Sequence, residues 1–142
     1  MSYSLPNIRQ ITESLGACAQ LNVSDIEALA ATGVKTLICN RPDYEDPEQP
    51  TSSSLQASAE KLGLEWHYLP VISGQVEVSQ GEEFARILAK AKSPVVAFCR
   101  SGARCGMLWA LGQRSHQDPQ KIVNQLKEAG YDMPDFFEKL LS

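Results

Sequence analysis

The chain is organised around one stretch in which an apolar run changes into a polar loop: Pro94-Val95-Val96-Ala97-Phe98-Cys99-Arg100-Ser101-Gly102-Ala103-Arg104-Cys105. The first five residues of this stretch form a short apolar run, which is typical of a buried strand. A small polar loop with Gly102 follows, and the apolar run 107–111 then predicts a buried helix. Cys99 is therefore expected where a strand ends, beneath the N-terminus of the next helix.

This position changes the chemistry of the Cys99 thiol. Free backbone N–H groups at a helix N-terminus carry partial positive charge, so they stabilise a thiolate and lower its pKa. Arg100 and Arg104 add positive charge, and their guanidinium groups suit an oxyanion. We interpret Cys99 as a nucleophile and Arg104 as an anion-binding residue; an inert buried cysteine is the alternative. The predicted anion-binding loop comprises Arg100, Ser101, Gly102, Ala103 and Cys105.

Length and composition indicate one ordinary globular domain over residues 1–142, with 43% apolar and 21% charged residues. The net charge of −4 argues against nucleic acid or a membrane surface as a partner. The chain shows neither a signal-peptide pattern nor an apolar run near the ~20 residues that span a bilayer, so cytoplasm is the expected compartment. The spacing of its four cysteines matches no zinc pattern, and we expect no metal and no cofactor.

Hydrophobic periodicity and capping signals predict helices that alternate with buried strands. Capping boxes are expected at Ser24–Glu27 and Ser79–Glu82, and an Asp118-Pro119 pair should start a later helix. The pattern predicts a three-layer α/β sandwich, with a central, mostly parallel sheet flanked by helices. The expected strands are 34–39, 64–69 and 94–98, with a hairpin within 1–22, and the expected helices are 24–33, 51–61, 79–91, 107–111, 118–130 and 134–141.

Several polar segments follow strands of this predicted sheet. Cys39 with residues 40–43, residues 70–72, and Cys99 all lie at carboxyl ends, where parallel sheets bind their ligands. One site can therefore be assembled from three separated segments. Cys39 and Cys105 are also candidate disulfide partners for an oxidised Cys99, with Cys39 the preferred one.

Two motifs together resemble a known family. Residues 38–43, Ile-Cys-Asn-Arg-Pro-Asp, and residues 99–104, Cys-Arg-Ser-Gly-Ala-Arg, resemble the bacterial DUF442 family, the phosphatase-like domain also found fused to beta-lactamase hydrolase-like proteins. The resemblance extends from about Ile11 to Leu141. It implies a fold similar to the dual-specificity cysteine phosphatases and a phosphocysteine intermediate. It also implies Cys99 as nucleophile and Arg104 as the phosphate-binding arginine.

The chain departs from the usual phosphatase pattern at several positions. Four residues instead of five separate Cys99 from Arg104, Phe98 stands where a histidine is usual, and Cys105 replaces a serine or threonine. The expected general-acid aspartate is missing from the loop after the 64–69 strand, which offers only Glu77. Asp43 is the best substitute, and a structural residue of the turn is the alternative for it. Arg41 either holds Asp43 or the bound anion, or is a surface arginine.

The short loop leaves two other functions open. The segment Cys-Arg-Ser-Gly-Ala-Arg also resembles the loop of rhodanese sulfurtransferases, in which the cysteine carries a persulfide and no general acid is needed. The third alternative is a non-catalytic anion-binding or redox-sensing module. We rank the phosphatase first. Its expected partner is a phosphorylated small molecule or protein, or a sulfur-carrying one if the chain is a sulfurtransferase.

Overall fold

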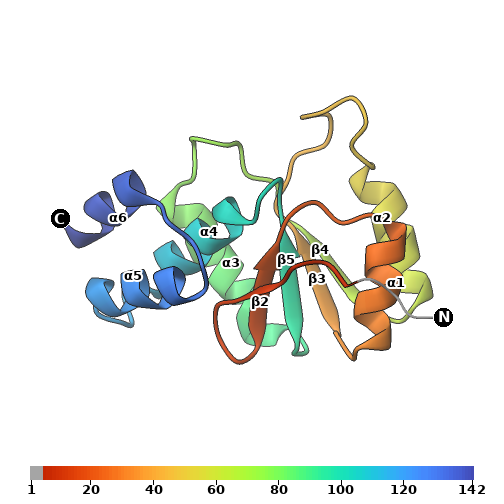
Figure 1. Ribbon diagram of the computed structural model, residues 1–142, viewed down its shortest axis with the longest axis horizontal. Coiled ribbons are helices and arrows are strands. Elements are labelled where there is room, and N and C mark those ends of the chain that lie inside the picture. The colour runs from red at the N-terminus through yellow and green to blue at the C-terminus, as the bar shows by residue number, and fades with distance from the viewer. Residues whose placement is uncertain (1–4) are drawn as a thin grey trace.

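A five-stranded sheet in the order β1-β2-β5-β3-β4 forms the centre of the computed structural model, which describes residues 5–142 (Figure 1). Only β1 runs antiparallel to its neighbour; the other strands are parallel. The strands are β1 (Arg9–Gln10), β2 (Leu15–Cys18), β3 (Thr36–Cys39), β4 (Glu65–Tyr68) and β5 (Val95–Phe98). The helices are α1 (Val23–Ala31), α2 (Ser52–Lys61), α3 (Val78–Lys90), α4 (Ala103–Gln113), α5 (Pro119–Glu128) and α6 (Pro134–Leu141).

Helices cover both faces of the sheet. Figure 1 shows α1 and α2 on one side and α3 to α6 on the other. Side chains alternate between the faces along a strand, so β5 contributes to two cores. Val95 and Ala97 pack on the side of α4, whereas Val96 and Phe98 pack on the side of α1. The predicted three-layer α/β sandwich is confirmed, and so is the N-terminal hairpin, which β1 and β2 form.

The register of the sheet aligns the strand ends at which the site was expected. Phe98, the last residue of β5, pairs with Cys18 of β2 on one side and with Cys39 of β3 on the other. Three segments therefore leave the sheet side by side at one edge. Figure 1 shows the loops after β3 and β4 rising at the same end of the sheet as the start of α4.

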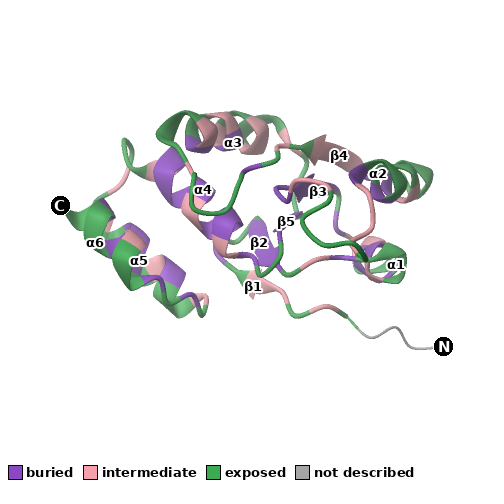
Figure 2. Cartoon of the chain, turned by 90° about the horizontal axis from the view of Figure 1, so that it is seen from above, coloured by how far each residue is buried: buried purple, intermediate pink, exposed green. Residues whose placement is uncertain are grey.

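Helix α4 is the central helix of its layer, and Figure 2 shows its extensive burial. Gly81 of α3 and Gly112 of α4 bring the two backbones into contact, because a Cβ atom on Gly112 would lie 2.6 Å from the Gly81 carbonyl oxygen. This close packing holds α4, and with it the residues at its N-terminus, in a fixed place.

Two predicted helix starts were wrong by one or two residues. Helix α1 is capped by Asn22, whose side chain accepts from the Asp25 N–H at 2.9 Å, and not by Ser24. Helix α3 begins after Glu77, whose N–H donates to Gln80 Oε1 at 2.8 Å. In both cases the earlier residue caps because its backbone is extended while the next turn is already helical. The Asp118-Pro119 start of α5 is confirmed.

None of the helices within residues 5–142 is both long enough and apolar enough to span a bilayer.

Candidate active site

The Cys99 loop, residues 99–104, connects β5 to α4 in one tight turn. Gly102 is the N-cap of α4 and has a φ of 93°, a left-handed conformation that favours glycine. A side chain at Gly102 would also collide with the hydroxyl of Tyr131 and approach the Cys18 carbonyl oxygen at 3.1 Å. Gly102 is therefore required both for the conformation of the turn and for the close packing of the turn against Tyr131 and Cys18.

The turn aims hydrogen-bond donors at the Cys99 sulfur. The Gly102 N–H donates to Sγ at 3.0 Å, and the backbone N–H groups of Ser101 and Arg104 also help to lower the pKa of the thiol. A hydrogen bond from the Cys105 side chain and these backbone bonds outweigh burial and lower the pKa of Cys99 from 9.0 to about 5. Burial and the neighbouring Cys99 sulfur raise the pKa of Cys105 well above its ordinary value, so Cys105 stays a thiol donor.

Alkylation with iodoacetamide tests this environment directly. At pH 7 we expect Cys99 to react at least about 100-fold faster than Cys18, because burial raises the pKa of Cys18 to about 12. The rate at Cys99 should fall with decreasing pH through a midpoint near 5. Mass spectrometry of peptides gives each rate separately. Equal rates at the two cysteines, or a midpoint above 8 for Cys99, would contradict the donor arrangement.

Arg104 lies in the first turn of α4 with its side chain 7% exposed. Its Nη1 donates to Glu45 Oε2 at 2.7 Å and to the Val71 carbonyl at 2.9 Å, and its Nη2 donates to Glu45 Oε1 at 2.9 Å. A guanidinium group has five N–H donors, so the Nε–H and one Nη2–H are left on one edge of the planar group. The hydrogen bonds to Glu45, and to a lesser degree the nearby Cys99 sulfur, raise the pKa of Arg104 above its ordinary value. The unused pair is a two-pronged donor suited to an anion beside the thiolate.

Glu45 is a site residue that the sequence did not reveal. Its carboxylate bridges two arginines, because Arg41 Nε donates to Oε1 at 3.0 Å while Arg104 binds both oxygens. The hydrogen bond from Arg104, together with that from Arg41, holds the pKa of Glu45 below its ordinary value. Arg41 is anchored in turn by Gln20 Oε1 at 3.1 Å. The sequence showed only an acidic loop with proline, in which no position stood out.

Asp43, the predicted substitute acid, is bound elsewhere. Oδ1 accepts from the Ser52 N–H at 2.7 Å and Oδ2 accepts from the Ser52 hydroxyl at 2.8 Å. Ser52 is the first residue of α2, so Asp43 stabilises the start of that helix. Tyr68 Oη accepts from the Asp43 N–H at 3.1 Å and holds the turn. These contacts do not support Asp43 as the general acid, although its catalytic role stays a prediction.

Asp43→Asn separates the capping role from the catalytic one. From the contacts we expect a lower Tm, from a loss of about 1 kcal/mol at the start of α2, with equal effects on alkyl and aryl phosphate turnover. Asp46→Asn, a matched change in the same exposed loop, is the control for charge. A much larger loss on alkyl than on aryl phosphates would instead make Asp43 the general acid.

The other predicted residues occupy different parts of the site. Arg100 and Ser101 are exposed, and Ser101 Oγ accepts from the Ala103 N–H at 3.3 Å. Cys39 packs on the α1 side of the sheet, where its thiol donates to the Arg41 carbonyl at 3.5 Å. Cys99 and Cys105 lie in the core on the α4 side. The preferred disulfide partner, Cys39, is therefore on the opposite face from Cys99, whereas Cys105 lies in the same core as Cys99.

The described residues do not bring together three or more His, Cys, Asp or Glu side chains in a way that could hold a metal ion.

This sheet, with a cysteine at the end of its central strand beneath a helix N-terminus, has the fold of the cysteine phosphatases. Kinase associated phosphatase superposes with a TM-score of 0.72 at 15% identity, and the match covers 98% of this chain and 94% of that chain. The family model of the phosphatase-like domain of beta-lactamase hydrolase-like protein matches residues 7–116. The chain belongs to this family.

Two further comparisons describe the relatives. A structure of a candidate phosphatase from Neisseria meningitidis Z2491 is 32% identical with a TM-score of 0.83, and the match covers 92% of this chain and 94% of that chain. A beta-lactamase hydrolase-like protein of Xylella fastidiosa is 34% identical over 106 residues, which are 75% of this chain and 25% of that protein. The chain thus spans about a quarter of the length of the curated relatives it matches.

Proposed function

We propose that this domain hydrolyses phosphate esters through a phosphocysteine intermediate on Cys99. The observation that carries the proposal is the pairing of a stabilised thiolate with the two free donors of Arg104. The thiolate is a nucleophile at neutral pH, and the adjacent donors suit the oxygens of a phosphoryl group. The family and the fold support phosphatase chemistry in general terms.

In the first step Cys99 Sγ attacks phosphorus and forms an S–P bond while the bond to the ester oxygen breaks. The leaving oxygen takes the electron pair. Charge on the non-bridging oxygens is stabilised by Arg104 and by the backbone N–H groups of the Cys99 loop. In the second step water attacks phosphorus, the S–P bond breaks, phosphate is released and the thiolate returns. The Cys105 thiol, which donates to Sγ, favours departure of the sulfur as an anion.

The carboxyl groups near the site limit the leaving groups that this mechanism handles well. Glu45 is held ionised by two arginines, Asp43 binds Ser52, and Glu77 occupies the N-cap of α3. None of these three is poised to protonate an alkoxide. We therefore expect phenolate-type leaving groups to depart much faster than alkoxides, because phenolates need little protonation.

A side-by-side assay tests the proposal. The purified protein is given 4-nitrophenyl phosphate, and separately thiosulfate with cyanide as sulfur acceptor. We expect release of nitrophenol and of phosphate, and a phosphorylated Cys99 peptide after rapid acid quench. Sulfur transfer with no phosphate release would replace the proposal by the rhodanese alternative. Neither reaction would leave an anion-binding or redox-sensing module.

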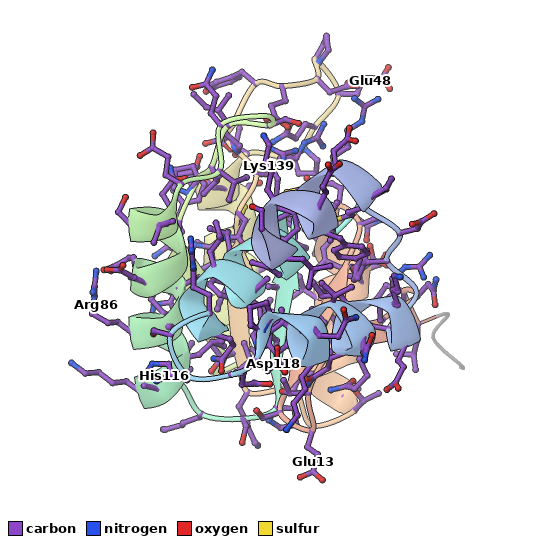
Figure 3. All side chains as sticks on the ribbon, turned by 90° about the vertical axis from the view of Figure 1, so that its left-hand side faces the viewer. Glu13, Glu48, Arg86, His116, Asp118 and Lys139 are labelled. Carbon is purple, nitrogen blue, oxygen red and sulfur yellow. The ribbon has the colours of Figure 1, made fainter. Side chains whose placement is uncertain are left out.

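Glu45→Gln tests whether Glu45 positions Arg104. The amide keeps the shape but loses the charge that anchors two N–H groups, so we expect kcat/KM to fall about tenfold and the Ki of inorganic phosphate to rise in parallel. Glu48→Gln is the matched control, because Glu48 lies at the outer end of the same loop (Figure 3). A purely structural role for Glu45 would lower Tm without changing the Ki. Recovery of phosphate affinity in Glu45→Asp would support positioning.

A further inference from the structure

A pocket of about 310 Å³ lies against the outer side of the Cys99 loop. Arg100 and Ser101 of the loop form one wall, and β1, β2 and the residues around them form the rest. Its polar lining consists of Asn7, Arg9, Gln20, Arg100 and Ser101. The mechanism described above uses none of the residues that β1 contributes to this pocket.

The charge of this pocket is unusual for an acidic protein. Two arginines line it and no carboxylate does, although the chain has a net charge of −4. Within residues 5–142, neither Arg9 nor Arg100 has a carboxylate oxygen within 4.0 Å. Four other pockets of the described residues either combine cations with carboxylates or have no charged lining residues. Unpaired arginines at a concave surface attract an anion.

Arg9 is held in place for such a role. Its Nη1 donates to the Gly130 carbonyl at 3.0 Å, and its guanidinium carbon lies 5.3 Å from the centre of the Tyr131 ring. The side chain is therefore fixed by a hydrogen bond and a cation–π contact, while most of its N–H donors stay free. Because the guanidinium is already ordered, an anion that binds it loses less side-chain entropy than one that binds a mobile arginine.

The pocket shares its wall with the candidate active site. The Arg100 carbonyl accepts from the Gln20 N–H at 3.4 Å, and the Cys18 carbonyl accepts from the Cys99 N–H at 3.4 Å. The segment that lines the pocket is thus bonded to the loop that surrounds the reactive sulfur. A molecule with one anionic group over Cys99 and a second anionic group in the pocket would therefore span the part of the loop that contains Arg100.

We propose that this pocket binds a second phosphate group of the substrate, beside the phosphoryl group that is transferred. The preferred substrate is then a small molecule with at least two phosphates, and Arg9 and Arg100 determine that preference. This inference rests on the proposed phosphatase function.

Calorimetric binding of alkyl phosphonates tests the proposal without turnover. The probes are α,ω-alkyl bisphosphonates of increasing chain length and the alkyl monophosphonates of equal length. We expect the bisphosphonate of best length to bind about tenfold or more tightly than its monophosphonate, and Arg9→Gln to reduce that ratio to near one. If Arg9→Gln lowers the Tm, Arg100→Gln is the independent test, because Arg100 is at an exposed position. This variant should also reduce the ratio.

Arg86→Gln is the matched control, because Arg86 extends from α3 into solvent (Figure 3) and should leave the ratio unchanged. Equal affinities for the two kinds of probe at every length would overturn the second site. A ratio that survives both Arg9→Gln and Arg100→Gln would also overturn it. Failure of the phosphatase proposal gives a different result. In that case the protein would hydrolyse no aryl phosphate, independently of how the phosphonates bind.

Discussion

Replacing Cys99 by serine is expected to lower kcat for 4-nitrophenyl phosphate by about four orders of magnitude or more, because a serine hydroxyl is not ionised where the thiolate is. The donors that lower the pKa of Cys99 to about 5 cannot bring an alcohol into its ionised form near neutral pH. Initial rates and the phosphocysteine peptide measure the loss. The fold should survive, since Sγ and Oγ can accept the same hydrogen bonds from the turn.

Cys18→Ser is the matched control for this change. Cys18 is a buried cysteine on the α1 side of the sheet, its pKa is raised to about 12, and no mechanistic step uses it. We expect the control to lower stability and leave turnover of the folded protein within a few-fold of the native value. Substantial hydrolysis by the Cys99→Ser variant would mean that another group attacks phosphorus.

The same substitution should also change how stability depends on pH. The pKa of Cys99 is lower in the folded protein, about 5, than its ordinary value of 9.0. The stability that ionisation of Cys99 contributes therefore grows as the pH rises from about 5 towards 9. This contribution is lost as the pH falls through 5, where the folded protein also binds the proton. Denaturant unfolding at several pH values should show this component in the native protein and not in Cys99→Ser.

Arg104→Lys is expected to lower kcat/KM by about 100-fold, although the charge is kept. A lysine ammonium cannot bind both oxygens of Glu45, the Val71 carbonyl and a phosphoryl group at once, as the guanidinium geometry allows. The Ki of inorganic phosphate should rise as well. Steady-state kinetics with an aryl phosphate and product inhibition give both quantities.

Arg86→Lys on the exposed face of α3 is the control for this substitution. Thermal unfolding of both variants separates a loss of fold from a loss of anion binding. Near-native kcat/KM in Arg104→Lys would transfer the anion-binding role to Arg100 or to the backbone of the loop.

The sequence by itself determined the α/β class, the position of Cys99 and the direction of its pKa shift. These depend on local causes. Residues 94–98 read as a buried strand because all of them are apolar or proline, and Gly102 indicates a turn that precedes a helix. Parallel strands end at one edge, so residues 40–43 were expected near Cys99, and the pairing of β3 with β5 brings them there.

Only the tertiary structure decided which side chains serve the reactive cysteine. Arg104 and Glu45 are 59 positions apart, and their contact depends on how the loop after β3 folds over the sheet edge. The same loop turns Asp43 towards Ser52, and β1 places Arg9 in the pocket that Arg100 also lines. The register of β2, β3 and β5 sends Cys18 and Cys39 to one face and Cys99 to the other. Local periodicity carries no information on such contacts, because they arise from chain closure over long sequence separations and from competition among polar groups for a few partners.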